Sequence, residues 1–437
     1  MHTTIAIPDR AAAIDQGLAA AVRWAGYVLF FLMLFVPTTY QPIKGALLAF
    51  VLAGILTSML ASGRLGLDRR VLLAAIAYSA LGAFFILRGY AAGAPGALQM
   101  FNVYVVWPLV YTMLVAGASS PGVLRGLVRV LVLAANAVAA YSVIYVLWSA
   151  GLWPDSLYYA FDQGQAIGFY PSHIEFNLYS ISTLLFLVPF VICALICLPD
   201  PDEPVRRRTL WLSVAATLLT VLLTGRRALL VLVPLAPIIG LVLRSWLPPE
   251  TKWASRRLVR HALWGALTLG TILVIVIAAL GGLAPAGFVN MVATGFQFDS
   301  DPVAMTRRDQ YGALVNGWLE SPLLGSGHGM PAPDVIRSVE TPWAYELTYL
   351  ALLYHTGVVG MLAYASGLAW IGTMSYRIAR RGWSEAPALM ATLSGTVIFL
   401  AANATNPYLE KYDYLWVIFL PVAFVNAWLV SPREHRA

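Results

Sequence analysis

The chain has 437 residues, of which 59% are hydrophobic and only 11% are charged. A soluble globular domain carries about 25% charged residues, so this composition excludes that class. Apolar runs of about 20 residues follow one another, each long enough to cross a hydrocarbon core of about 30 Å. Because backbone amides in lipid must pair within the chain, such runs predict helices rather than barrel strands. We expect an all-α polytopic membrane protein with a single integral membrane domain over residues 1–437.

The net charge of +7 does not indicate a nucleic-acid partner. The arginines lie in short clusters between apolar runs, where orientation in the membrane explains them. Cys193 and Cys197 lie inside one apolar run without a nearby His or carboxylate, and we interpret them as inert buried thiols. No HExxH or CxxC motif occurs, so we expect neither a metal site nor a cofactor.

Hydrophobic periodicity predicts about twelve spans. Their expected positions are 20–37, 43–62, 71–88, 98–117, 126–150, 178–198, 209–224, 228–247, 262–283, 343–376, 386–405 and 412–430. The tenth segment is too long for one crossing and contains Gly357. We therefore expect a short helix over 343–355, dipping in from the surface, followed by the true crossing.

The distribution of basic residues predicts the orientation of the chain. If the N-terminus is cytoplasmic, the inner loops carry most of the arginines, among them Arg69, Arg70 and Arg206–Arg208. This bias predicts that both termini are cytoplasmic. It also places a long loop, 284–342, between the ninth and tenth spans on the outer face, together with a shorter loop over 151–177.

Four arginines on the predicted outer face are candidate ligands of a phosphate. Arg226 and Arg227, in LLTGRRALLVLV, oppose the topology rule at the ends of two spans joined by almost no loop. Arg307 and Arg308 lie in the long outer loop. A guanidinium is permanently charged and matches phosphate oxygens bidentately, which favours a diphosphate clamp. The alternative is pairing with loop acids such as Asp309.

Glu346 and His328 are the candidates for proton transfer. Glu346 lies among apolar residues at the expected start of a helix, and Tyr349 at i+3 shares its face. A carboxylate at an apolar boundary suits a general base, although a first-turn glutamate can also face water and complement the helix dipole. His328 lies in SPLLGSGHGMP, a glycine-rich turn expected to leave backbone amides exposed. We expect His355 to be structural.

Four separated segments carry a resemblance to a known family. They are IGFYPSHIEFNLYSISTLLFLVPF, LLTGRRALLVLVPL, TRRDQYGALVNGWLESPLLGSGHG and YELTYLALLYHTGVVG. Together they resemble the O-antigen ligase/polymerase superfamily, with Arg226 or Arg227 and Arg307 at the family's arginines and Tyr311 at an aromatic position. Two departures stand out. The family's His–Asn pair falls on Glu346–Leu347, and its Pro–Asn pair falls on Pro171–Ser172.

The resemblance implies a GT-C-like fold and metal-independent, inverting glycosyl transfer at the periplasmic face of the bacterial inner membrane. The donor would be an oligosaccharide on undecaprenyl diphosphate, and the acceptor a glycan or a lipid-linked glycan. Arg226, Arg227, Arg307 and Arg308 would hold the diphosphate, and Glu346 would deprotonate the acceptor hydroxyl, with His328 as the second candidate. Tyr311, Tyr349 and Arg337 would contact substrate. Outer aromatic residues such as Trp343, Tyr345 and Tyr408 could stack on sugars or form the ordinary interfacial belt.

Three functions are consistent with these features. We favour a polysaccharide polymerase, because the departure from His–Asn suggests distance from typical ligases. An O-antigen ligase that transfers glycan to lipid A-core shares the donor chemistry and differs only in its acceptor. A non-catalytic polysaccharide or lipid transporter is the third. The chain has no visible repeat, and its polar residues gather on one face rather than at the midplane, which argues against transport.

Overall fold

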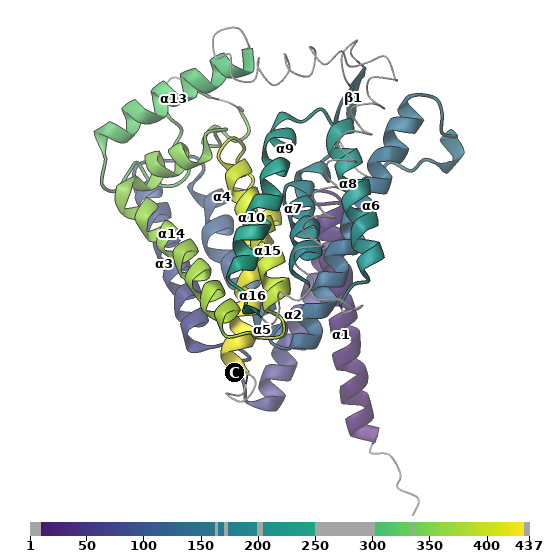
Figure 1. Cartoon of the computed structure of the whole chain (residues 1–437). Helices are drawn as coiled ribbons and strands as arrows, with labels where there is room; N and C mark the ends of the chain where they lie inside the picture. The colour runs from purple at the N-terminus through teal and green to yellow at the C-terminus, as the bar shows by residue number, and fades with distance from the viewer. Residues whose placement is uncertain are drawn as a thin grey trace, which may run out of the picture.

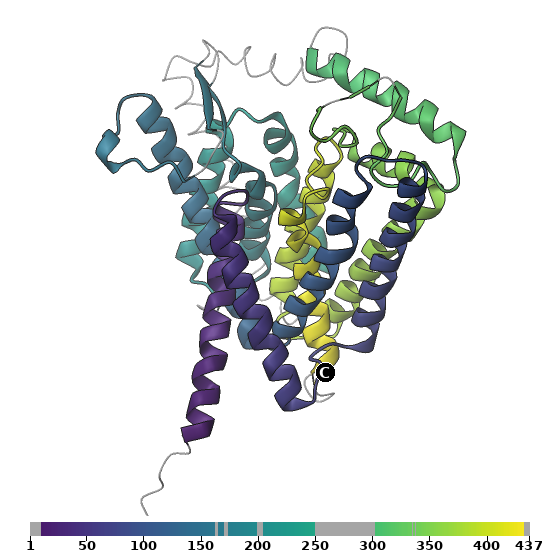
Figure 2. The same ribbon diagram turned by 180° about the vertical axis from the view of Figure 1, so that it is seen from behind.

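The computed structural model describes residues 10–161, 165–169, 174–198, 204–249, 302–333, 335–336 and 338–431. Within these ranges the protein is a helical bundle with a single two-stranded sheet (Figure 1). Viewed from behind (Figure 2), α13 (Pro302–Glu320) again lies across one end of the bundle. We call this the α13 end, and the described chain finishes at the opposite end. The predicted all-α class is confirmed.

Most of the bundle helices are apolar along their length. In chain order they are α1 (Arg10–Phe35), α2 (Gln41–Ser62), α3 (Arg69–Ala91), α4 (Ala97–Phe101), the π-helical η1 (Asn102–Val106), α5 (Trp107–Gly117), α6 (Pro121–Ser149), α7 (Ile181–Cys197), α8 (Arg207–Leu223), α9 (Arg227–Leu232), η3 (Val233–Leu235), α10 (Ala236–Ser245), α14 (Thr348–Arg380), α15 (Ala386–Asn403), η5 (Tyr412–Tyr414) and α16 (Trp416–Val430). A 3-10 turn, η2 (Asp155–Leu157), precedes the antiparallel strands β1 (Ala166–Phe169) and β2 (Ile174–Asn177).

In the part of the chain that the structure describes, nine helical segments are long and apolar enough to cross a membrane. They include two composite runs, Ala97–Gly117 and Ala228–Ser245. The helices α7 and α8 have 17 residues each, or about 25 Å at 1.5 Å per residue. Each of these segments coincides with an expected span. The expected ninth span, 262–283, lies outside the described residues.

The centre of the bundle is α7, in which every residue is buried. This helix is apolar on all sides, which is typical of a helix surrounded by others. It packs against α15, α10, α8 and α6. At Gly395 of α15 the approach is so close that a Cβ atom would lie 2.8 Å from the Phe186 backbone and ring. The thiols of Cys193 and Cys197 are buried in this core, as expected.

The long tenth segment is a broken helix, as the sequence predicted. Gly357 interrupts α14 with φ 61° and ψ −172°, although the first part begins at Thr348 rather than at residue 343. The turn 321–329 binds to this break: Val358 and Val359 donate backbone hydrogen bonds to Pro322 and Leu323. A Cβ atom at Gly357 would lie 2.3 Å from the Leu323 backbone, so only glycine fits there.

The expected outer loop over 284–342 is more ordered in its second half than the sequence predicted. Residues 302–320 form α13, and the following turn enters the bundle at its second half, where Gly327 and His328 are buried. The buried face of α13 consists of Gln310, Leu314 and Gly317, spaced by four and three residues. This face packs on α14, where a Cβ atom at Gly317 would lie 2.6 Å from the Tyr354 ring. A helix covers this end of the bundle where an irregular loop was expected.

Candidate functional site

The ion pair between Arg307 and Glu346 joins α13 to the segment that precedes α14. Arg307 Nε donates to Glu346 Oε2 at 2.7 Å, and the two side chains are 34% and 16% exposed. Arg307 lies one turn before Gln310, on the buried face of α13. Gln310 Oε1 in turn accepts a hydrogen bond of 2.9 Å from the Glu346 backbone N–H. The two predicted residues therefore lie together at the α13 end.

The surroundings of Glu346 differ from the sequence prediction in one respect. Glu346 lies two residues before α14, whose N-cap is Leu347, so it is not a first-turn residue. The sequence predicted that Glu346 and Tyr349 share one face of a helix. Because Glu346 lies outside α14, they do not. The Tyr349 hydroxyl donates to the Leu400 carbonyl at 2.6 Å, near the end of α15. The alternative of a glutamate that simply faces water is also wrong, because its carboxylate is bound by Arg307.

Arg226 lies in the tight turn between α8 and α9, at the same end of the bundle. Gly225, with φ 64°, makes this turn possible, since only glycine adopts that conformation freely. Arg226 Nη2 donates to Asn177 Oδ1 of β2. The Tyr408 hydroxyl also accepts a hydrogen bond from Arg226. Burial raises the pKa of Tyr408, and the guanidinium partly offsets that rise.

In both views the turn between α15 and α16 lies between α9 and α13, the helices that begin next to Arg226 and contain Arg307 (Figures 1 and 2). Asn403 Oδ1, at the end of α15, accepts from the Leu409 backbone N–H at 2.9 Å and so shapes the turn. Tyr408 points to Arg226 from this turn. Burial raises the pKa of Tyr345, the neighbour of Glu346, and the charge of Glu410 in the same turn adds to that rise. The turn thus contacts Arg226 through Tyr408, and the charge of Glu410 in the same turn acts on Tyr345, next to Glu346.

His328 is placed away from these groups, in the interior. Its side chain is fully buried and its ring stacks on Tyr104 at 4.0 Å, with Nε2 hydrogen-bonded to Tyr364 at 3.2 Å. Burial lowers the pKa of His328 well below its usual value, and the neighbouring His355 adds to this. His355 is buried as well, and its Nε2 lies 2.9 Å from the Met330 carbonyl. His328 therefore packs in the interior through its ring and Nε2, while its Nδ1 is buried without a hydrogen-bond partner among the described residues.

The prediction that this glycine-rich turn exposes its amides is wrong. The amides of Ser326 and Gly327 donate to Tyr354 and His355, which lie just before the break in α14, and that of His328 donates to Phe85 of α3. The glycines allow this close approach: a Cβ atom at Gly327 would lie 2.2 Å from the Gly89 backbone. The turn thus uses its amides to bind α14 and α3, and they cannot form an anion site.

The remaining predicted residues contribute less to this arrangement. Arg308 and Tyr311 are both exposed; Arg308 projects from the side of α13 opposite its buried face, and Tyr311 lies at the edge of that face. Arg227 is the first residue of α9, next to Arg226. Arg337 lies outside the described residues. Trp343 and Tyr345 are buried in the protein, so neither presents a ring face to a sugar.

Sequence reasoning missed the polar groups around the site: Asn177 accepts from Arg226, Gln310 accepts from the Glu346 amide, and Asn403 shapes the turn that carries Glu410. Asn177, Gln310, Asn403 and Glu410 each lie beside an apolar helix or within α13, and no motif marked them. The one available signal was their position at the ends of apolar runs, where polar residues are common. Within the described ranges no group of three or more His, Cys, Asp or Glu side chains is arranged to hold a metal ion.

Comparison with known proteins gives no independent assignment: no protein-family model matches the chain, and no curated protein matches it. The site must therefore be interpreted from its own chemistry. That chemistry consists of two guanidinium groups on either side of one turn, with a carboxylate in direct contact with one of them.

Proposed function

We propose that the protein is an inverting, metal-independent membrane glycosyltransferase with a GT-C-like fold of twelve spans. Its donor is a glycan carried on undecaprenyl diphosphate, and its role is that of a polysaccharide polymerase. The observation that carries this proposal is the location of Arg226 and Arg307 at one end of the bundle, with Glu346 bound to Arg307. Guanidinium groups are the strongest protein ligands for a diphosphate, and a carboxylate beside them can accept a proton.

The reaction can be written from these groups. The acceptor hydroxyl attacks the anomeric carbon of the donor sugar, and the bond from that carbon to the diphosphate oxygen breaks. Glu346 takes the hydroxyl proton, and undecaprenyl diphosphate leaves with the electron pair. Arg226 and Arg307 stabilise the negative charge as it develops on the leaving oxygen. A diphosphate oxygen would compete with Glu346 for Arg307, which would release the carboxylate to act as the base.

Arg307 is the better phosphate ligand of its pair, because it lies on the inward face of α13 whereas Arg308 is exposed. The orientation is supported by the loops at the opposite end, which join α2 to α3, α5 to α6 and α14 to α15. These loops and the flanking helix ends carry Arg64, Arg69, Arg70, Arg125, Arg380 and Arg381. By the positive-inside rule, that end is cytoplasmic and the α13 end is periplasmic.

The direct test is glycosidic bond formation by the purified full chain in liposomes with a lipid-diphosphate-linked oligosaccharide. The expected product is lengthened glycan on the lipid carrier. Transfer that requires lipid A-core as acceptor would instead assign the ligase reaction. Movement of the donor across the bilayer without any new glycosidic bond would assign transport and overturn the proposal.

Two variants in the site and one control variant connect the activity to the site. Arg307→Ala and Glu346→Gln are expected to abolish transfer, because each removes a group in contact with the reacting atoms. Arg125→Ala serves as the control, since it breaks an ion pair of the same 2.7 Å length, to Glu385, at the other end of the bundle. Equal losses in all three variants would mean that activity depends only on stability.

A further inference from the structure

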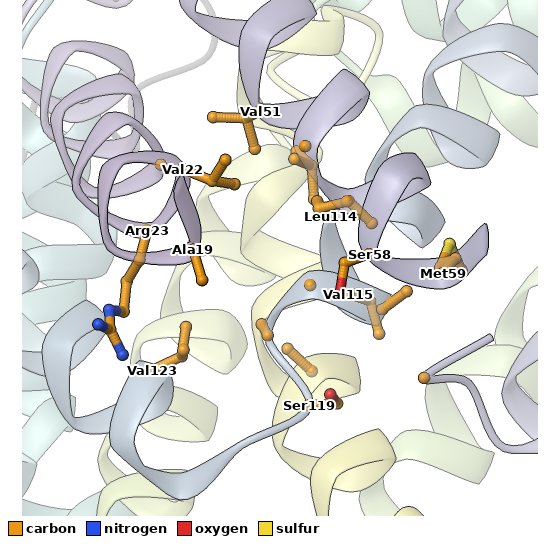
Figure 3. Close-up of a pocket in the computed structure, with 18 of the residues that line it drawn as sticks. Ala19, Val22, Arg23, Val51, Ser58, Met59, Leu114, Val115, Ser119 and Val123 are labelled. Atoms are coloured by element: carbon orange, nitrogen blue, oxygen red, sulfur yellow. The ribbon is translucent and has the colours of Figure 1, made fainter. Parts of the chain in front are cut away.

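A groove lies between α1, α2, α5, α6 and α16, at the end of the bundle opposite α13 (Figure 3). Its volume is about 910 Å³. The walls are largely apolar, with Val22, Leu114 and Val115 among the residues whose side chains surround the space. Figures 1 and 2 show the N-terminal half of α1 extending away from the bundle, which opens the groove on one side.

The dimensions of the groove match one leaflet of a bilayer. Its wall on α2 runs from Val51 to Ser62, which spans about 16 Å at 1.5 Å per residue. Half of a hydrocarbon core of about 30 Å is about 15 Å. Tyr111 and Trp416 line the groove, and so do Arg64, Leu65 and Gly66 just beyond the end of α2; we call the end at these three residues its mouth. Because the lining helices α1, α2, α5, α6 and α16 belong to predicted spans, the chains of a membrane lipid are the apolar groups that can reach it.

The charge at the mouth of the groove is positive. Two basic residues, Arg23 and Arg64, line it, and no carboxylate does among its described lining residues. Arg23 lies three residues inside the predicted span 20–37, about 5 Å from its start. An ionisable side chain at that depth needs an anionic partner or must extend to the interface. Ser58 of α2 and Ser119, just after α5, also line the groove, across the space from Arg23 (Figure 3).

We propose that this groove binds one anionic phospholipid, with an acyl chain between α1 and α2 and the phosphate at Arg23 and Arg64. The apolar lining accounts for the chain, and the two guanidinium groups account for the phosphate. In the proposed orientation the site faces the cytoplasmic leaflet, in which anionic lipids attract basic residues near the membrane surface. The site is separate from Arg226, Arg307 and Glu346, so it does not depend on the proposed reaction.

The test is native mass spectrometry of the full chain, released from detergent after titration with phosphatidylglycerol or with phosphatidylcholine of the same acyl chains. The wild type is expected to retain one phosphatidylglycerol in preference to phosphatidylcholine. Each arginine near the membrane surface raises the affinity for an anionic lipid about fivefold. Arg23→Gln should therefore lower phosphatidylglycerol retention about fivefold, and the double variant Arg23→Gln with Arg64→Gln should lower it about 30-fold.

Two further variants make the test specific to the groove. Arg69→Gln with Arg70→Gln removes the same charge from the start of α3, outside the groove, and is expected to change retention less than twofold. Ser58→Trp fills the groove without changing charge and is expected to abolish retention. The proposal is overturned if the two lipids are retained equally or not at all. It is also overturned if the α3 pair matters as much as Arg23 and Arg64, or if Ser58→Trp has no effect.

Discussion

Exchanging the charges of Arg307 and Glu346 tests whether this ion pair has a catalytic role or only a structural one. The three variants are Arg307→Glu, Glu346→Arg and the double exchange. The pair is short, at 2.7 Å, but its side chains are 34% and 16% exposed, so water weakens it. A pair of this kind contributes about 0.5–1 kcal/mol, and two like charges cost a similar amount. Each single variant should therefore lose about 1–2 kcal/mol of unfolding free energy, and the double exchange should recover most of it.

The activity of the same three variants follows a different order if the proposed mechanism holds. Removal of a general base costs about 10²–10⁴-fold in rate, and the exchange does not restore a base at the right place. Thermal unfolding in detergent and the initial rate of glycosidic bond formation should thus diverge: the double exchange regains stability but stays inactive. Recovery of both properties together would refute the reasoning, because the pair would then act only as a clasp between α13 and α14.

Three other variants probe the surrounding structure. His328→Phe should keep transfer activity, because the buried ring packs rather than reacts. It should also flatten the pH dependence of unfolding: with a pKa held below 6.5, His328 contributes stability that is complete above pH 6.5 and declines as the pH falls below it. Gly357→Ala should cost about 1–3 kcal/mol in backbone strain, plus the clash with Leu323. Asn177→Ala should lower transfer about 10–100-fold by freeing Arg226 from its acceptor.

The glycine and histidine variants each have a control within the chain. Gly367→Ala lies in the regular part of α14 with open space around its Cβ, so it should be neutral or slightly stabilising. His355→Phe removes a hydrogen bond of 2.9 Å to the Met330 carbonyl, whereas His328→Phe removes a longer one, of 3.2 Å, to Tyr364, so His355→Phe should destabilise the fold more. If His328→Phe lost glycosyl-transfer activity but kept its stability, His328 would again be a candidate general base.

The broad architecture could be predicted because the membrane makes it simple. Apolar runs must become helices in lipid, so every expected span in the described ranges coincides with a helix. The break at Gly357 was also predictable, from the length of the segment and the position of its glycine. Helix α13 was not, because its pattern is polar on most sides and its buried face has only a few residues, such as Leu314 and Gly317.

The site could be predicted only in part, because the sequence does not fix the rotation of a surface helix. Arg307 and Arg308 are equivalent in the sequence, and only the bounds of α13 place one inward and the other outward. His328 was a reasonable candidate in a glycine-rich turn, yet the same glycines allow that turn to enter the bundle. Asn177 and Gln310 act through contacts distant in sequence, which no local pattern records.

The most direct test of the central claim is a structure of the protein with undecaprenyl diphosphate bound. The account predicts that the diphosphate lies between Arg226 and Arg307, and that Arg307 has exchanged Glu346 for a phosphate oxygen. The Glu346 carboxylate should then face the position of the acceptor hydroxyl. A diphosphate bound elsewhere, or an intact Arg307–Glu346 pair beside the bound lipid, would contradict it.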